Sequence, residues 1–228
     1  MGTEAPAAPE AGTIEVASRS GRVEVVARPV PRPEVLDGDA TIDASGRVIG
    51  TGTGRVRIAC PEGADVIVGA TSGRIECRGR MGRVAITNTS GRVTVEHARE
   101  LEVRTRSGRV TVDRCEGLAR VVVGSGAVQI TAAGALEATT TSGRVTAEAV
   151  GDATVRVGSG RVTLGLTGAG VVDIRTQSGR VGLTLPAGVH PSLQLSSRSG
   201  RVTSEVEAGT DGSVTVETGS GRIQVTRR

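Results

Sequence analysis

The chain contains no phenylalanine, tyrosine or tryptophan, so a hydrophobic core must be built from valine, isoleucine, leucine and alanine. Small and β-branched side chains suit thin, closely spaced layers of β-structure better than a thick globular core. The same absence removes the rings on which sugars and nucleic-acid bases commonly stack. No run approaches the roughly 20 apolar residues of a membrane-spanning helix, so we expect no membrane span.

Lysine is absent as well: all 28 basic residues are arginine, against 24 acidic residues, for a net charge of +4. Arginine differs chemically from lysine because its planar guanidinium group forks onto carboxylates and phosphates. A GC-rich coding bias would give the same replacement without any binding role. The acidic residues are interspersed, so the basic excess does not form a polybasic tail.

Cysteine and histidine are sparse, which argues against a disulfide framework, a zinc site or a catalytic triad. Cys77 is expected in the core, Cys60 at a strand end, and Cys115 in a turn as the most reactive thiol. His97 and His190 are expected as exposed turn residues. We therefore predict no metal, no cofactor and no enzymatic activity.

Two other patterns point away from catalysis. Asp37, Asp39 and Asp43 form the densest acidic cluster, but they adjoin a proline-rich segment and are typical of turns. The many glycines are not followed by helical periodicity, so they do not form a dinucleotide-binding or phosphate-binding loop.

Residues 1–12 are expected to form a flexible tail. They lack the basic and apolar regions of a secretory signal, so we predict a cytoplasmic location and leave surface association open. Residues 13–228 are expected to form one β-strand-repeat domain. Its proline-rich stretch at 27–38 reads as a loop, because three prolines in five residues exclude a central strand.

A repeat dominates the remainder of the chain. Ser-Gly-Arg followed by Val or Ile begins at Ser20, Ser45, Ser72, Ser90, Ser107, Ser142, Ser159, Ser178, Ser199 and Ser220. Around each Ser-Gly, apolar and polar residues alternate, which is the pattern of half-buried strands. Each unit therefore reads as two short strands joined by a Ser-Gly corner, where a residue without a Cβ is needed.

The near-constant unit length favours an all-β, single-stranded β-helix, or β-solenoid, of about ten short rungs. Rungs would stack at roughly 4.8 Å, the spacing between neighbouring strands. An antiparallel β-sandwich of stacked hairpins is the alternative. We expect an offset first hairpin over 13–26, and a last unit that exposes its strand edge because no capping helix follows it.

Stacking in register would place the arginines that follow the corner glycines in one ladder. The regularly spaced members are Arg92, Arg109, Arg144, Arg161, Arg180, Arg201 and Arg222. Like charges directly opposite one another in a sheet are unfavourable. Acidic residues four positions after the arginine could relieve the repulsion, as could bound anions; the former are Glu96, Asp113, Glu148 and Glu205.

The repeated phrase T-x-S-G-R-V-x-V resembles the bacterial adhesin-like family of β-strand repeats, domain of unknown function 4097. The resemblance covers about residues 13–228 and implies a β-helical fold without catalytic residues. In that family the usual corner is Ser-Gly-Asp, whereas this chain has arginine in place of the aspartate. A cation-binding role for an acidic ladder therefore does not transfer to this chain.

Two functions remain open from the sequence. The first is a non-catalytic scaffold that binds an unknown protein partner or associates end to end with itself. The alternative is a module that binds a polyanion, either nucleic acid or an anionic glycopolymer, along the arginine ladder. The interspersed acidic residues favour a third and simpler interpretation of the ladder, a self-neutralised charged surface.

Overall fold

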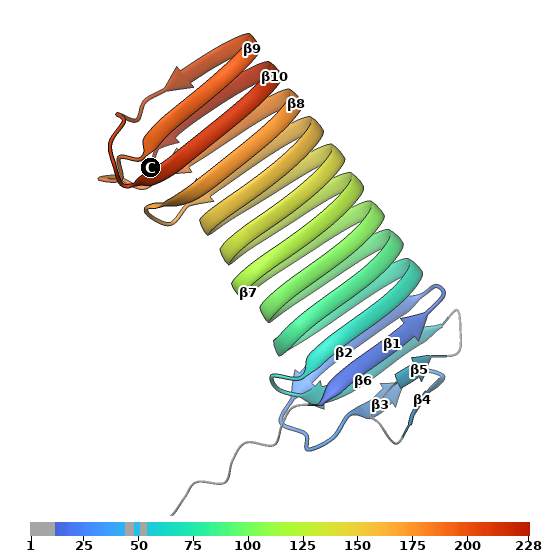
Figure 1. Cartoon of the computed structure of the whole chain (residues 1–228). Helices are drawn as coiled ribbons and strands as arrows, with labels where there is room; N and C mark the ends of the chain where they lie inside the picture. The colour runs from blue at the N-terminus through green and yellow to red at the C-terminus, as the bar shows by residue number, and fades with distance from the viewer. Residues whose placement is uncertain (1–11, 44–47, 51–53) are drawn as a thin grey trace, which may run out of the picture.

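The computed structural model describes residues 12–43, 48–50 and 54–228, which coil into a rod of stacked rungs (Figure 1). Regular structure in these residues consists of strands alone. They are β1 (Thr13–Ser18), β2 (Arg22–Arg28), β3 (Glu34–Asp37), β4 (Ala40–Ile42), β5 (Val48–Gly50), β6 (Arg55–Pro61), β7 (Asp65–Leu166), β8 (Gly170–Leu185), β9 (Ser192–Ser204) and β10 (Gly212–Arg227).

Neighbouring rungs pair in parallel and in register. Arg161 of β7 faces Arg180 of β8, and Arg222 of β10 faces the same Arg180 from the other side. Within the described residues, antiparallel pairing is confined to β3 with β6 and β4 with β5. The predicted β-solenoid is therefore confirmed, and the antiparallel sandwich is excluded.

The Ser-Gly corners do not interrupt the pairing, which is why β7 runs continuously for 102 residues. Each corner glycine lies on the carbonyl group of the corner glycine in the rung below. A Cβ on Gly143, for example, would collide with the carbonyl oxygen of Gly126. The column consists, in stacking order, of Gly21, Gly73, Gly91, Gly108, Gly126, Gly143, Gly160, Gly179, Gly221 and Gly200.

The core is built from columns of small apolar side chains. Val162, Val181, Ile223 and Val202 occupy equivalent positions in four successive rungs. The first three of these are at most 1% exposed. Because each side chain packs on a similar one at the strand spacing, no aromatic residue is needed to fill the interior.

A polar column lies inside the corner, two residues before the serine. Thr105 donates a hydrogen bond to the carbonyl oxygen of Ser107 at 3.3 Å, and Thr176 donates to that of Ser178 at 3.2 Å. Asn88 donates in the same way to Ser90 at 2.9 Å. In these three rungs the polar side chain therefore lies on the inner side of the corner and satisfies the carbonyl oxygen of the corner serine.

Both ends of the rod depart from chain order. The first rung, β1 and β2, lies between the rung of β5 and β6 and the start of β7. At the other end, β10 lies between β8 and β9, so β9 forms the terminal edge (Figure 1). The predicted exposed strand edge is thus present, but it belongs to β9 and not to the last unit of the chain.

The predicted hairpin over 13–26 is wrong. β1 and β2 are the two sides of one rung, because Gly21 has a φ of +118° and forms the same corner as the later glycines. The loop predicted at 27–38 is shorter than expected, since Arg28 belongs to β2 and Glu34–Asp37 form β3. Strands β3 and β4 cover the N-terminal end by antiparallel pairing.

Two sequence predictions concern residues that the structure does not describe. The expected tail falls almost entirely on residues 1–11, and most of the repeat copy that begins at Ser45 falls on 44–47.

Substitution of Gly143 by alanine should lower the free energy of unfolding by about 1–3 kcal/mol, because φ is +154° and the new Cβ meets a carbonyl oxygen. The urea midpoint measures this loss. Gly168→Ala is the matched control, since a Cβ there has no atom within 4 Å. Equal midpoints for the two variants would contradict the stacked-corner explanation.

Candidate functional site: the arginine ladder

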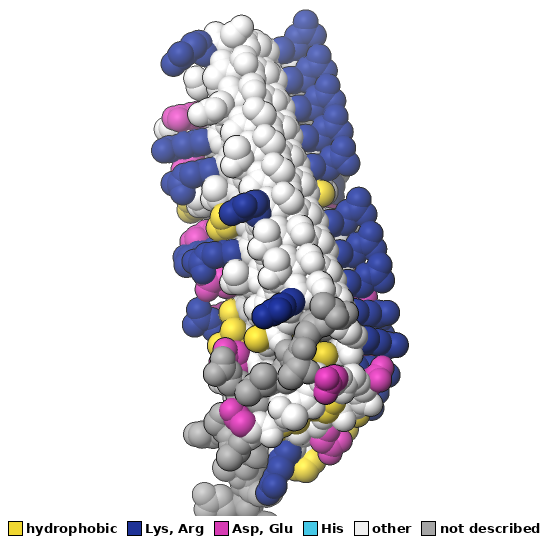
Figure 2. Space-filling model, turned by 90° about the vertical axis from the view of Figure 1, so that its right-hand side faces the viewer, with side chains coloured by type: hydrophobic (Ala, Val, Ile, Leu, Met, Phe, Trp, Pro, Cys, Tyr) yellow, Lys and Arg dark blue, Asp and Glu magenta, His cyan; other side chains and the backbone are white. Residues whose placement is uncertain are grey.

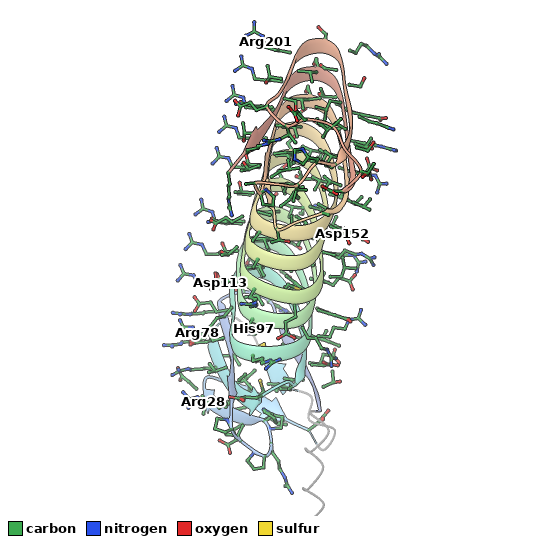
Figure 3. All side chains as sticks on the ribbon, turned by 90° about the vertical axis from the view of Figure 1, so that its left-hand side faces the viewer. Arg28, Arg78, His97, Asp113, Asp152 and Arg201 are labelled. Carbon is green, nitrogen blue, oxygen red and sulfur yellow. The ribbon has the colours of Figure 1, made fainter. Side chains whose placement is uncertain are left out.

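The seven arginines predicted as a ladder lie in one column along an edge of the rod. All seven are exposed, and each directly follows a stacked corner glycine. Figure 2 shows the column as a row of dark blue side chains that is interrupted once. Figure 3 shows the row from the opposite side, with Arg201 at its upper end. Arg222 precedes Arg201 in the stack, because β10 is inserted before β9.

Three further arginines extend the ladder toward the N-terminal end. Arg22 lies between Arg55 and Arg74 in register. The sequence prediction omitted them because it used only the regularly spaced copies. The signal was nevertheless present, since Arg22 and Arg74 follow Ser-Gly like the others.

This N-terminal part of the ladder is neutralised by two buried glutamates. Glu24 is 2% exposed and has guanidinium nitrogens of Arg55 and Arg78 within 3.4 Å. Glu76 accepts hydrogen bonds from Arg22 at 2.8 Å and from Arg78 at 2.9 Å. Burial alone would raise the pKa of the Glu76 carboxyl, but these hydrogen bonds and charges outweigh it and hold the pKa below its ordinary value.

The seven predicted ladder arginines have no such partners. In the part of the chain that the structure describes, none of them has a carboxylate oxygen within 4.0 Å. The expected relief by Glu96, Asp113, Glu148 and Glu205 is wrong. A residue four positions along a strand lies about 13 Å away, beyond the reach of an ion pair. Glu96 instead accepts a hydrogen bond from the backbone of Gly79 at 2.9 Å.

The opposite sheet of the solenoid shows the contrast. There, arginines and acidic residues in neighbouring rungs pair with one another. Arg120 bonds Glu137 at 2.7 Å, and Arg83 bonds Glu102 at 3.2 Å. Pairing on this sheet is incomplete, since Arg106, Arg156 and Arg198 have no carboxylate oxygen within 4.0 Å in the described part of the chain. The ladder differs in that none of its seven predicted arginines is paired.

A shallow groove runs beside the ladder, with a volume of about 770 Å³. Corner glycines from Gly126 to Gly221 and the arginines that follow them line it, from Arg144 to Arg222. At one end lies Ala127, which takes the place of an arginine in its rung. Glycine adds no side chain beyond the main chain, so the groove is open along the rod axis.

A second groove of about 840 Å³ lies on the sheet before the corner, and sequence reasoning missed it. Arg156, Arg175 and Arg198 line it together with Thr141 and Glu217. Arg175 is partly neutralised by Asp173 at 3.4 Å and by Glu217 at 3.7 Å. This groove therefore carries mixed charge, unlike the groove beside the ladder.

The remaining candidates for chemistry have structural partners. His97 is hydrogen bonded to Glu116 at 3.0 Å, and Glu116 also pairs with Arg80 at 2.9 Å. The hydrogen bond from His97 lowers the pKa of the Glu116 carboxyl, and the charge of Arg80 lowers it further. His190 is half-exposed, and its backbone N–H donates to Asp211 at 3.0 Å.

All three cysteines are buried and free. Burial raises the pKa of Cys60 to about 11 and that of Cys77 to about 12. Burial also raises the pKa of Cys115, which is 2% exposed. The expectation that Cys115 is an accessible turn thiol is therefore wrong, because its side chain packs in the core.

No group of three or more histidine, cysteine, aspartate or glutamate side chains with the geometry of a metal site occurs among the described residues. Asp37 of the predicted acidic cluster pairs with Arg55 at 3.7 Å. Nor do the described residues contain a helix of the length and apolar character needed to cross a membrane.

Comparison with known proteins agrees with the fold. The family model for the Toastrack domain, domain of unknown function 4097, matches residues 12–227. The chain belongs to the Toastrack family. The resemblance seen in the repeated phrase is thus confirmed over nearly the whole length of this Toastrack chain.

Other similarities are weak. A crystal structure of a presumed cell adhesion protein from Clostridium sporogenes has 10% sequence identity and a TM-score of 0.22, with 95% of this chain and 93% of that chain covered. A TM-score this low carries no argument about shape or function. No curated protein matches this Toastrack chain.

The ion pairs of Glu76 predict an acid-sensitive contribution to stability. Because its folded pKa lies below the ordinary value of about 4.3, the contribution is complete above that value and is lost as pH falls through the folded pKa. Urea unfolding should show Glu76→Gln less stable than wild type at pH 7, with the difference shrinking below about pH 4.

The matched control is Glu207→Gln, an exposed glutamate that has no arginine nitrogen of the described ranges within 4.0 Å. It should leave the free energy of unfolding almost unchanged at neutral pH. A Glu76→Gln deficit that stays constant with pH would show that the ion pairs are not its cause.

Proposed function

We propose that this chain is a non-catalytic, rod-shaped interaction module that binds a linear polyanion along its arginine ladder. One observation carries the proposal: among the described residues, seven exposed arginines stand in one column without a carboxylate oxygen within 4.0 Å. On the opposite sheet, by contrast, Arg83, Arg104, Arg120 and Arg175 are paired. This column supports polyanion binding over a self-neutralised surface as the interpretation of the ladder.

The stacking itself supplies a driving force for anion binding. Arg161, Arg180 and Arg222 lie in adjacent rungs, roughly 4.8 Å apart along the rod. Like charges directly opposite in a sheet are destabilising. A bound row of anions would relieve this repulsion and release counterions, which makes the affinity high at low salt and strongly salt-dependent.

The burial of reactive groups supports a non-catalytic role. The cysteine thiols are in the core with raised pKa values, and His97 is engaged with Glu116. The ladder itself offers charge and hydrogen-bond donors but no nucleophile, because arginine remains protonated at any physiological pH.

The test is Arg144→Ser, Arg161→Ser and Arg180→Ser combined, measured with polyphosphate, heparin and single-stranded DNA between about 50 and 200 mM salt. Loss of three contacts should weaken binding on the order of tenfold or more at the low end. The slope of log affinity against log salt should become shallower by about 2.

The control combines Arg28→Ser, Arg99→Ser and Arg114→Ser, which changes the net charge equally. These three arginines are exposed, lie outside the ladder and have no ion pair within 4.0 Å to any residue that the structure describes. The control should bind like wild type. Equal losses in both triple variants would attribute binding to net charge, and no binding to any of the three polymers would refute the function.

A second candidate function, self-association, is favoured by the edge of β9. Val202 is 40% exposed, whereas Ile223, at the same core position in the next rung, is fully buried. Leu193 and Leu195 are likewise only partly buried against the core. Because β3 and β4 cover the other end, the second copy would pair through its own β9, giving tail-to-tail dimers and not filaments.

A charge at the open edge should block such a dimer. Val202→Lys is expected to sediment as a monomer at every concentration, while wild type shifts toward a dimer as concentration rises. Val171→Lys is the control, since Val171 is 61% exposed but lies away from the terminal edge. Monomeric wild type at all concentrations would exclude self-association.

A further inference from the structure

The unpaired part of the ladder is divided into two unequal tracts. Ala127 follows the corner glycine Gly126 and leaves one rung without a guanidinium group. On the N-terminal side of this gap, the unpaired ladder arginines among the described residues are Arg92 and Arg109, because the next arginines are bound to Glu24 and Glu76. On the other side lies an unbroken tract of five, which we call the C-terminal tract: Arg144, Arg161, Arg180, Arg222 and Arg201.

The groove beside the ladder runs along four of the five arginines of the C-terminal tract; Arg201 lies beyond its lining. Its lining begins at Gly126 and Ala127, and it continues past Arg144 as far as Gly221 and Arg222. The gap in the charge and the end of the groove therefore fall on the same rung. Both follow from one residue, because the arginine side chains form a wall of the groove and Ala127 supplies neither charge nor wall.

The dimensions of this tract restrict the shape of the ligand. Five arginines at the strand spacing extend for roughly 19 Å in a straight line. One wall of the groove is a single row of guanidinium groups, and its floor is bare main chain at glycines such as Gly160 and Gly179. A single extended chain can contact every arginine of such a row. A double helix or a flat membrane would leave the floor of the groove empty.

The chemistry of the groove lining restricts which charged groups the ligand can carry. Guanidinium forks onto phosphate with two hydrogen bonds, and a row of them recognises repeated phosphates. The chain has no phenylalanine, tyrosine or tryptophan, so bases and sugar rings lack their usual stacking platforms. The groove lining of glycine and arginine therefore favours recognition of a charged backbone.

We infer that the C-terminal tract is a seat for a single extended chain of linked phosphates, of the type of inorganic polyphosphate, and that Ala127 sets its N-terminal limit. This inference rests on the proposed polyanion-binding function. The phosphate backbone of a single-stranded nucleic acid offers the same chemistry, and its bases would remain unrecognised.

Polyphosphates of defined length test the seat. Affinity should rise with chain length until the chain spans the C-terminal tract, and should gain little beyond that length. Ala127→Arg should join the two tracts into one row of eight and move this plateau to longer chains. The slope of log affinity against log salt for long chains should steepen by up to about 2, because Arg92, Arg109 and the new arginine each add one contact.

Ala127→Gln is the control, because it fills the same position without charge. It should leave the plateau and the salt slope at their wild-type values. The new arginine is sterically acceptable, since arginine occupies the equivalent position in the rungs on both sides, at Arg109 and Arg144. A folded Ala127→Arg protein, verified by its urea midpoint, that keeps the wild-type plateau would overturn the inference.

Other polymers separate this inference from the proposed function. Single-stranded DNA with the same number of phosphates should bind equally for different base sequences, and a clear sequence preference would overturn the seat. Tighter binding of a polyuronate than of polyphosphate would also overturn it while leaving polyanion binding intact. Failure of every polyanion to bind would refute the proposed function itself.

Discussion

The stacking of each Ser-Gly corner on the corner below is the contact on which the remainder of the molecule depends. The main chains approach so closely there that a Cβ at Gly108 would collide with the carbonyl oxygen of Gly91. Only glycine allows this approach, and its positive φ turns the chain from one sheet into the other. The hydroxyl of Thr105 then completes the corner from inside by donating to Ser107.

This constraint also creates the charged surface. When corners stack without offset, every equivalent residue is brought to one line at the strand spacing, whether or not its side chains attract one another. This arrangement stabilises the core, because valine side chains pack on similar side chains of the neighbouring rungs. The same arrangement is unfavourable for the ladder arginines, because their charges repel one another. Glu24 and Glu76 relieve this repulsion in the N-terminal part of the ladder, whereas it remains unrelieved in the rest.

The two ends of the rod differ in how their outermost strand edges are formed. At the N-terminal end the short strands β3 and β4 pair in antiparallel orientation and cover the rung of β5 and β6. At the other end the serine-rich strand β9 forms the outermost rung, and the C-terminal strand β10 is held between β8 and β9. Serine side chains such as Ser197, which bonds the carbonyl oxygen of Gly221 at 3.4 Å, make this last rung more polar than those before it.

The repeat was sufficient to predict a β-solenoid, the Ser-Gly corner and the identity of the seven ladder arginines, because these follow from local alternation and constant spacing. It could not predict that β1 and β2, or β10, are inserted between other rungs. A rung can pair equally well with any other rung that carries the same repeat. It also placed Cys115 wrongly, because near a turn a shift of one residue along the chain decides whether a side chain lies in the core or outside it. The pairing of charges was decided only by the tertiary structure: Glu24 meets arginines of other rungs, whereas Glu148 lies too far along its own strand to reach Arg144.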